Sequence, residues 1–317
     1  MMGNSLFGPS NPAPESGYDD PPSRKGFFTD TSICIGCKAC EVACKEWNEV
    51  PDDGFDLLGM SYDNTGSLGA STWRHVAFIE QPKMTGRQES EVRPTVDLGM
   101  PTVSAPAGHE VQLPDSGTDD DKPDFRWLMS SDVCKHCTHA ACLDVCPTGS
   151  LFRTEFGTVV VQDDICNGCG YCVPACPYGV IERRNGPKGT KNVGIAQKCT
   201  LCYDRLDAGK TPACAQACPT QSIQFGDVDE LRERAQDRVD ALHAGGIMDA
   251  RLYGADPDDG IGGAGAFFLL LDEPEVYGMP PDPVVTTKDL PQMFNRASAA
   301  AGALLVGAVL SFVGRRR

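Results

Sequence analysis

The stretch DICNGCGYCVPACPYGVI, residues 164–181, decides the fold of this chain. It spaces four cysteines as C-x2-C-x2-C-x3-C and places Pro177 directly after the last one: Cys166, Cys169, Cys172 and Cys176. Gly168 and Gly170 allow a tight turn between the first three, because glycine adopts backbone conformations that other residues avoid. The spacing therefore gathers three thiols around one point and leaves the fourth on the following helical turn.

Three further groups of four cysteines lie on both sides of this stretch. The groups at 134–146 and 199–218 keep the CxxC start and the CxxxCP end but widen the middle. The group at 34–44 has the full spacing, although Lys45 replaces the proline. All sixteen cysteines of the chain therefore fall into four groups: Cys34, Cys37, Cys40 and Cys44; Cys134, Cys137, Cys142 and Cys146; Cys166, Cys169, Cys172 and Cys176; and Cys199, Cys202, Cys214 and Cys218.

The spacing C-x2-C-x2-C-x3-C-P is the run with which bacterial ferredoxins bind [4Fe–4S] clusters. Three cysteines of a run hold one cluster, and the fourth completes a second cluster nearby. Gly36, like Gly168 and Gly170, permits a close approach of the backbone to the cluster sulfides. The four groups therefore predict an α+β fold with two ferredoxin-like units and four [4Fe–4S] clusters.

Other uses of cysteine fit the sequence less well. Zinc ribbons also use CxxC pairs, but they do not produce this run, so structural zinc is a distant alternative. No group reads CxxCH, so covalent haem is not indicated. A Rieske centre would need two histidines in place of two cysteines, whereas the group containing His136 and His139 already has four. We expect both histidines to pack or hydrogen-bond near a cluster.

Composition and length exclude further classes. The chain has 317 residues, a mass of 33.9 kDa and a formal charge of −16. A general nucleic-acid binder needs a basic surface, so no nucleic acid is expected as a partner. Disulfide frameworks belong to small secreted domains, whereas this chain is large, and its first 26 residues contain no apolar run of the signal-peptide kind.

The segments around the cysteines predict the domain organisation. Residues 1–26 are rich in Pro, Gly, Ser and Asp and predict a mobile tail. Residues 27–226 form the double ferredoxin-like domain, interrupted by a loop-rich insertion at 48–125 that holds strand candidates such as WRHVAFIE at 73–80 and an acidic loop at 119–121. CPTGSL at 146–151, CPYGVI at 176–181 and CPTQSI at 218–223 each predict the end of a short helix and the start of a strand.

A C-terminal extension, residues 227–296, follows the cysteine region. Apolar residues recur at three- and four-residue spacing over 227–246 and predict an amphipathic helix that ends at Gly245 and Gly246. GIGGAG at 260–265 has the formal spacing of a dinucleotide-binding loop, but it precedes a strand-like AFFLLL instead of opening a helix. No catalytic motif is present, so the chain is not expected to be an enzyme on its own.

Residues 297–314, ASAAAGALLVGAVLSFVG, carry no charge and precede three arginines. As a helix they would span about 27 Å, just short of a hydrocarbon core of roughly 30 Å. A buried core helix and a loose Ala-rich tail are the alternatives to a membrane anchor. The position of the arginines favours a single anchor with the cluster domain on the extracytoplasmic side.

Long stretches of the chain resemble a known family. TSICIGCKACEVACKEWN at 31–48, residues 132–181 and KCTLCYDRLDAGKTPACAQACPTQSI at 198–223 are similar to iron–sulfur beta subunits of the molybdopterin oxidoreductases, and within them to the beta subunit of membrane-bound formate dehydrogenase. ARLYG at 250–254, LDEPEVYGMPPDP at 271–283 and the terminal apolar segment also resemble that subunit. The resemblance covers roughly residues 27–317.

The resemblance implies an electron-transfer subunit. Its partners would be a molybdopterin catalytic subunit that oxidises formate and a membrane subunit that carries cytochrome b haem or reacts with quinone. It also implies four cubanes, held by Cys34, Cys37, Cys40 and Cys218; by Cys199, Cys202, Cys214 and Cys44; by Cys134, Cys137, Cys142 and Cys176; and by Cys166, Cys169, Cys172 and Cys146.

Three alternatives stay open at this point. The chain could serve a sister enzyme that acts on sulfur oxyanions, sulfoxides or nitrate, or a hydrogenase. It could be a soluble polyferredoxin, or, from a different class, a structural zinc protein. Lys38, Lys45, Lys135 and Lys198 adjoin cysteines and could raise cluster potentials, but we expect their ammonium groups to be solvated.

Overall fold

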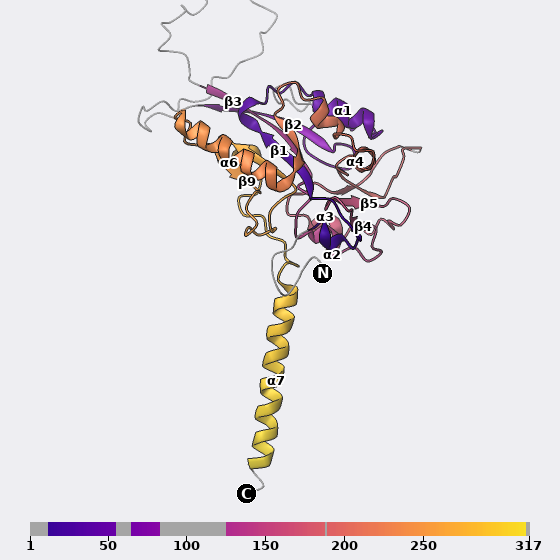
Figure 1. Cartoon of the computed structure of the whole chain (residues 1–317). Helices are drawn as coiled ribbons and strands as arrows, with labels where there is room; N and C mark the ends of the chain where they lie inside the picture. The colour runs from indigo at the N-terminus through magenta and orange to yellow at the C-terminus, as the bar shows by residue number, and fades with distance from the viewer. Residues whose placement is uncertain (1–11, 55–64, 83–124, 188, 315–317) are drawn as a thin grey trace, which may run out of the picture. The chain divides into compact units, whose positions relative to one another are not determined.

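The computed structural model describes residues 12–54, 65–82, 125–187 and 189–314. The expected acidic loop at 119–121, much of the insertion, the first residues of the expected tail and the three final arginines lie outside these ranges. Helices and strands alternate along the described residues (Figure 1), which is the α+β content expected from the sequence. One compact unit comprises residues 1–78 and 129–317, and a second, much smaller unit comprises residues 79–128.

A four-stranded sheet joins segments from both ends of the cysteine region. Its order is β8, β1, β10, β9, with bounds Ile223–Asp227, Lys25–Asp30, Ala266–Leu270 and Arg251–Tyr253. Strand β1 runs parallel to β10, and it runs antiparallel to β8, where Gly26 lies opposite Gly226. The strand expected at AFFLLL, residues 266–271, is therefore present. The two strands β9 and β10 of the 227–296 segment pair in the same sheet as β1.

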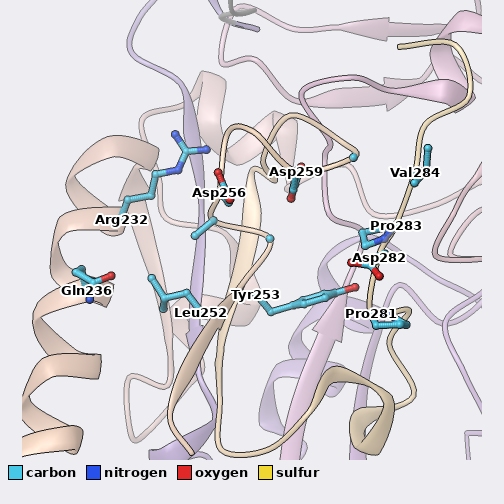
Figure 2. Close-up of a pocket in the computed structure, with 13 residues that line it drawn as sticks. Arg232, Gln236, Leu252, Tyr253, Asp256, Asp259, Pro281, Asp282, Pro283 and Val284 are labelled. Carbon is cyan, nitrogen blue, oxygen red and sulfur yellow. The ribbon is translucent and has the colours of Figure 1, made fainter. Parts of the chain in front are cut away.

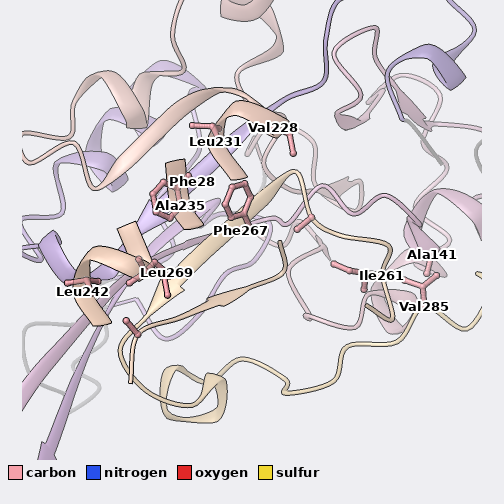
Figure 3. Close-up of a cluster of buried hydrophobic side chains, with 13 residues drawn as sticks. Phe28, Ala141, Val228, Leu231, Ala235, Leu242, Ile261, Phe267, Leu269 and Val285 are labelled. Atoms are coloured by element: carbon pink, nitrogen blue, oxygen red, sulfur yellow. The ribbon is translucent and has the colours of Figure 1, made fainter. Parts of the chain in front are cut away.

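Helix α6, Val228–Ala244, supplies one side of the main hydrophobic core (Figure 3). Its buried residues are those that the periodicity predicted: Val228, Leu231, Ala235, Val239 and Leu242. They pack with the sheet, in which the rings of Phe28 and Phe267 stack with centroids 5.5 Å apart. Each buried phenylalanine of this kind contributes roughly 2 to 3 kcal/mol. Asp229 and Glu230 in the first turn suit the positive end of the helix dipole, and the helix ends at Gly245.

Short helices surround the cysteines. They are α1 (Ala39–Trp47), α2 (Ala141–Asp144), α3 (Cys172–Ala175), α4 (Tyr203–Asp207) and α5 (Ala213–Gln216). Helices α2, α3 and α5 end just before a Cys-Pro pair, and β4, β6 and β8 follow, as the repeats predicted. A proline has no N–H for the helical hydrogen bond, so the helix cannot continue through it. The sequence predicted the fourth cysteine on a helical turn: Cys44 does lie within α1, whereas in the other three groups the fourth cysteine lies just beyond the helix.

Small two-stranded sheets complete the region. Strand β4, Leu151–Arg153, pairs with β5, Val159–Val161, and β6, Glu182–Arg183, pairs with β7, Ala196–Gln197. Strand β2, Arg74–Pro82, contains most of the expected WRHVAFIE strand and pairs with β3, Phe125–Val133. Three short 3-10 helices, η1, η2 and η4, cover Pro14–Ser16, Thr31–Ile33 and Pro274–Tyr277.

The C-terminal helix is longer than the sequence predicted. Helix α7 covers Leu290–Gly314, 25 residues, and begins seven residues before the expected start at 297. The expectation was wrong because Arg296 ends the uncharged run, while a charged side chain does not interrupt the backbone hydrogen bonds of a helix. At 1.5 Å per residue, α7 is about 37 Å long. Its segment Gln292–Phe312 has a mean hydropathy of 1.4 and none of it is buried, so it is not a core helix of the described chain.

Candidate iron–sulfur sites

The first site combines the N-terminal cysteine group with one thiol from the last group. Four thiols line one cavity and are called set A: Cys34, Cys37, Cys40 and Cys218. Gly36 turns the chain between the first two with φ +64°, and a Cβ atom there would lie 2.6 Å from the Phe78 ring and 2.7 Å from the sulfur of Met129. Glycine is therefore required for both conformation and space.

A second cavity lies in the middle of the sequence. Its thiols are called set C: Cys134, Cys137, Cys142 and Cys176. Burial raises the pKa of Cys137 well above its ordinary value, and the other three thiols of the set raise it further. Burial also raises the pKa of Cys142 to about 12. Four thiols of two different groups thus face one space, and neither Cys137 nor Cys142 ionises readily there.

Two more sets follow from the thiols that interact with one another. Set B comprises Cys44, Cys199, Cys202 and Cys214: burial raises the pKa of Cys44, and the three other thiols add to that shift. The Asn48 amide nitrogen lies 3.7 Å from the sulfurs of both Cys44 and Cys202.

Set D comprises Cys146, Cys166, Cys169 and Cys172. The pKa of Cys172 rises to about 11, mainly through burial and in part through the other three thiols. Each set thus takes its fourth thiol from another group.

Thiols of neighbouring sets also interact with one another. Besides burial, Cys214 of set B raises the pKa of Cys40 in set A. In the same way Cys134 of set C raises the pKa of Cys199 in set B, and Cys172 of set D contributes to the raised pKa of Cys142 in set C. Electrostatic interaction between thiols requires proximity. The four sets therefore form a row in the order A, B, C, D.

The ends of the row are exposed and its interior is not. Cys37 of set A and Cys169 of set D are exposed, whereas all four thiols of set B are buried. Large apolar side chains also reach the surface beside the two end sets: Ile35 and Val42 at set A, and Ile165 and Tyr171 at set D. Exposed apolar side chains beside a candidate cofactor site are typical of surfaces that bind partner proteins.

The thiols fit [4Fe–4S] clusters and do not fit single ions. All sixteen are free, so none is taken up in a disulfide. In a zinc site the sulfurs would lie about 3.8 Å apart, since each Zn–S bond is about 2.3 Å. Among the described residues no three His, Cys, Asp or Glu side chains are arranged to hold one metal ion. Four thiols around a cavity are instead the donor set of a cubane.

The pKa of Cys146 departs from the trend among buried thiols such as Cys44, whose pKa values are raised by burial. Burial acts to raise the pKa of Cys146, but hydrogen bonds from Ser150, from the Leu151 backbone and from Thr148 outweigh it and lower this pKa to about 6. The Ser150 hydroxyl lies 3.2 Å from the Cys146 sulfur. With a pKa of about 6, the Cys146 thiol is largely a thiolate at neutral pH, the form that binds metal.

Two lysines contradict the expectation of solvated ammonium groups. Lys135 and Lys198 are buried, and both line the set C cavity. The Lys198 ammonium donates to the Val159 carbonyl and, at 2.9 Å, to that of Cys199. The Lys135 ammonium donates to the Val133 carbonyl at 3.0 Å and pairs with Asp132. Backbone carbonyls replace water as their partners, which sequence spacing does not reveal.

The lysines of the N-terminal group remain partly exposed. Lys38 lies 3.6 Å from Glu41, and Lys45 lies 2.7 Å from Asp53. Lys38 therefore pairs with the buried Glu41 and Lys45 with the partly exposed Asp53, and water reaches both ammonium groups.

One histidine of the second group behaves as expected. His136 is buried beside set C, and its Nδ1 accepts a hydrogen bond of 3.1 Å from the Val159 backbone. This confirms the expectation that a histidine of this group hydrogen-bonds near the thiols.

Sequence reasoning missed Arg74. The residue was noted only as part of a strand candidate, yet its side chain is buried beside thiols of sets A and B. The one signal for it in the sequence is a cation at the start of a strand with the apolar centre VAFI, because a buried charge needs partners.

One hollow on the surface does not involve the thiols (Figure 2). It lies between α6 and the segment that contains the GIGGAG glycines, and its lining includes Arg232, Tyr253 and Asp259 but no cysteine. Gly262 and Gly263 turn the backbone with φ of +73° and +79° ahead of strand β10. The segment leads into strand β10, as the sequence predicted, and does not open a helix.

Known proteins match this chain over most of its length. The 4Fe-4S dicluster domain family matches twice, over residues 33–150 and 125–228. The nitrate-inducible formate dehydrogenase iron–sulfur subunit of Escherichia coli (strain K12) is 33% identical over 308 residues, 95% of this chain and 88% of that one. The formate dehydrogenase iron–sulfur subunit of Haemophilus influenzae is 35% identical over 261 residues, 81% of this chain and 68% of that one.

A second enzyme is also represented. The B subunit of the anaerobic dimethyl sulfoxide reductase of Escherichia coli (strain K12) is 31% identical over 215 residues, 68% of this chain and 79% of that one. Its match covers less of this sequence than the matches of the formate dehydrogenase subunits do. With sixteen free thiols in four groups and two dicluster domains, this protein belongs to the family of formate dehydrogenase iron–sulfur subunits, electron-transfer subunits to which the B subunit of dimethyl sulfoxide reductase is related.

Proposed function

We propose that this protein conducts electrons through four [4Fe–4S] clusters held by sets A, B, C and D. The observation that carries the proposal is the row of four thiol sets, in which each set borrows its fourth thiol from another group and adjoins the next. A [4Fe–4S] cluster supplies reversible one-electron chemistry when bound. All sixteen cysteines act as ligands, and no residue of the chain performs bond chemistry on a substrate.

The protein contributes position and exclusion of water. Burial keeps set B away from solvent, and the short helices ahead of each Cys-Pro pair orient the thiols toward their cavities. The exposed ends of the row receive and deliver electrons, because the exposed thiols among the described residues, Cys37 and Cys169, lie there. Ile35 and Val42 at one end, and Ile165 and Tyr171 at the other, supply apolar surface for two different partners.

The proposed donor is a molybdopterin catalytic subunit that oxidises formate to carbon dioxide. The proposed acceptor is a membrane subunit with cytochrome b haem or a quinone site. The relatives that cover most of this chain are subunits of formate dehydrogenase, which supports formate over other substrates. The relative from dimethyl sulfoxide reductase supports a sister enzyme acting on sulfoxides as the second candidate.

Helix α7 is the proposed membrane anchor. Its apolar segment Gln292–Phe312 is long enough for a hydrocarbon core of about 30 Å, and none of it is packed inside the protein. The arginines that follow at 315–317 favour the cytoplasmic side of the membrane, which would leave the cluster domain on the extracytoplasmic side.

The proposal is tested by anaerobic purification of the tagged full-length protein from detergent-solubilised membranes. We expect about sixteen irons and sixteen acid-labile sulfides per molecule, a pterin-containing partner in the eluate, and formate-dependent reduction of a dye. A pterin partner that ignores formate but reduces sulfoxides would favour the second candidate. Zinc without acid-labile sulfide would overturn the electron-transfer role.

The anchor is tested separately by deletion of residues 290–317. We expect the shortened protein to leave the membrane fraction when it is expressed without its partners, and to keep its iron and sulfide. An unchanged membrane fraction under the same conditions would contradict a role of α7 as the anchor.

A further inference from the structure

Arg74 is the largest fully buried side chain among the described residues, and its guanidinium has an incomplete set of partners. The residue opens strand β2, and its side chain is 2% exposed. Nη1 donates to the Ser131 carbonyl at 3.2 Å and to the Ser131 hydroxyl at 3.0 Å. The guanidinium carbon lies 5.0 Å from the centre of the Phe27 ring. These contacts hold the group in one orientation.

The thiols around this guanidinium come from two sets. Burial raises the pKa of Cys40 to about 12, and the charge of Arg74 is the strongest influence in the opposite direction. Burial likewise raises the pKa of Cys44, and Arg74 again opposes the shift. Cys199 and Cys214 are the other thiols close enough to interact with it. Arg74 therefore lies where set A meets set B.

Ser131 connects the same group to a ligand candidate. Its hydroxyl lies 3.2 Å from the sulfur of Cys40 and 3.0 Å from Nη1 of Arg74. This short series of contacts fixes the position of the guanidinium relative to set A. A flexible surface arginine could not act in this way, because it would be screened by water.

The second terminal nitrogen, Nη2, is buried and has no hydrogen-bond partner among the described residues. Burial of an unpaired polar group costs free energy, and for a charged group the cost is large. A group that the protein holds between its thiols would supply the acceptors that Nη2 lacks among the described residues. Cluster sulfides and ligating thiolates are such acceptors, and hydrogen bonds to them are among the factors that set a cluster's reduction potential.

We infer that Arg74 is a positioning residue shared by the clusters of sets A and B, with Nη2 donating to their sulfur atoms and its positive charge favouring their reduced forms. The inference rests on the proposed function. Each transfer adds one electron to one cluster and removes it from its neighbour, so the acceptor gains one negative charge. A fixed cation at the junction stabilises that charge in either cluster, which holds the two potentials at a raised level.

Arg184 provides a matched control. It is also a buried arginine, but its guanidinium donates to the backbone carbonyls of Ala70, at 2.7 Å, and Lys191, at 3.3 Å. The influences on its pKa are burial, which lowers it, and then Asp163, so no thiol is involved. Replacement of Arg184 removes a buried guanidinium from the protein without removing a cation from the thiol row.

The test is an EPR-monitored potentiometric titration of the full-length protein in its membrane complex, for the wild type, Arg74→Gln and Arg184→Gln. Besides the signals of the partner subunits' own redox centres, we expect four one-electron waves from the clusters of this chain in the wild type. In Arg74→Gln two of them move to lower potential, with at least a tenfold change in the reduction equilibrium, which is about 59 mV for a one-electron couple. The other two stay in place, and Arg184→Gln moves none. Four waves at wild-type potentials in Arg74→Gln, or an equal shift of all four, would overturn the inference.

Arg74→Lys keeps the test decisive if Arg74→Gln does not assemble its clusters. Lysine retains the charge but cannot donate to Ser131 and to the sulfurs through one planar fork. We therefore expect the same two waves to shift to lower potential by a smaller amount. Wild-type potentials in Arg74→Lys would contradict the inferred role of Arg74. Absence of acid-labile sulfide in the wild type would instead defeat the proposed function, so the two failures are distinguishable.

Discussion

Sets A and B differ from sets C and D in how far apart in the sequence their thiols lie. Sets A and B, here the split half, join cysteines of 34–44 to cysteines of 199–218. Sets C and D, the contiguous half, use only residues 134–176. The split half depends on a sheet in which β1 pairs with β8 and β10, whereas the contiguous half is bordered by the two-residue and three-residue strands β4 to β7.

The difference shows what holds each half together. Long-range pairing must offset the entropy of closing a long loop, so the split half requires a large core, and α6 and the sheet supply one. The contiguous half closes short loops and has a smaller core around Leu151, Val159 and Ile181. Its cations are also different, because two buried lysines line set C whereas the lysines of the N-terminal group stay near the surface.

The largest expected effect tests whether each cluster of the split half takes its ligands from two cysteine groups, 34–44 and 199–218. Cys218→Ala should lower the iron content by about a quarter, because one of four clusters loses a ligand. The double variant with Cys34→Ala should lose no more, since both thiols belong to set A. The double variant with Cys199→Ala should lose about half, since it affects sets A and B. Iron and sulfide analysis after anaerobic purification gives these values.

If each group held its own cluster, the two double variants would exchange their results. The contiguous half offers the matched experiment. Cys176→Ala combined with Cys134→Ala should lose about a quarter of the iron, and combined with Cys166→Ala about half.

The second effect concerns the sheet of the split half. A Cβ atom on Gly26 would lie 2.0 Å from the Gly265 carbonyl oxygen and 2.7 Å from Val228, so Gly26→Ala should cost about 3 kcal/mol. Gly226 lies directly opposite, but its nearest neighbour would be Leu231 at 3.8 Å, so Gly226→Ala should be tolerated. Anaerobic urea unfolding measures both. Equal unfolding midpoints of the two variants would show that the space beside Gly26 does not limit the pairing of β1 and β10.

The third expected effect is a difference in stability between replacing a buried lysine that lines set C and replacing a partly exposed lysine of the N-terminal group. Lys198→Met should cost about 2 kcal/mol, because the buried carbonyls of Val159 and Cys199 each lose a donor. Lys45→Met in the split half should cost less than about 1 kcal/mol, because only a partly exposed ion pair with Asp53 is lost. The unfolding midpoints of the two variants give the two losses of stability, which can then be compared. A larger loss for Lys45→Met would contradict the difference between the buried lysines that line set C and the partly exposed lysines of the N-terminal group.

The smallest effect concerns an ion pair at the edge of the split half. Hydrogen bonds from Lys25 and Ser23 lower the pKa of Asp227 below its ordinary 3.8. A folded-state pKa below the unfolded one stabilises the protein above that range and loses this contribution as the pH falls through it. Asp227→Asn should therefore cost about 0.5 kcal/mol, and equally at pH 7 and pH 5. Unfolding midpoints at the two pH values measure this, and a difference that fades already between them would contradict a lowered pKa.

Local features of this protein could be predicted from the sequence because neighbouring residues determine them. The spacing in 164–181 indicates tight cysteine loops, each Cys-Pro pair ends a short helix, and the periodicity of 228–242 identifies the buried face of α6. Steric limits on glycine and proline and the helical repeat act within a few residues, so they need no tertiary context. The start of α7 was predicted wrongly, because the end of an uncharged run is not the end of a helix.

Which group lends its fourth thiol to which set is a tertiary property. Spacing shows only that the fourth cysteine points to a neighbour, and the neighbour of Cys218 lies at the other end of the cysteine region, at Cys34. The burial of Lys198 and Arg74 is of the same kind, because their partners are distant carbonyls, a serine and thiols.

The sequence alone determined the number and local shape of the thiol loops. The tertiary structure decided which groups share a set, and the long-range pairing of β1 with β8 joins the segments that lead into the first cysteine group and out of the last. The physical reason is that contacts between distant segments depend on packing that no local pattern encodes, whereas a loop of three cysteines is shaped by its own few residues.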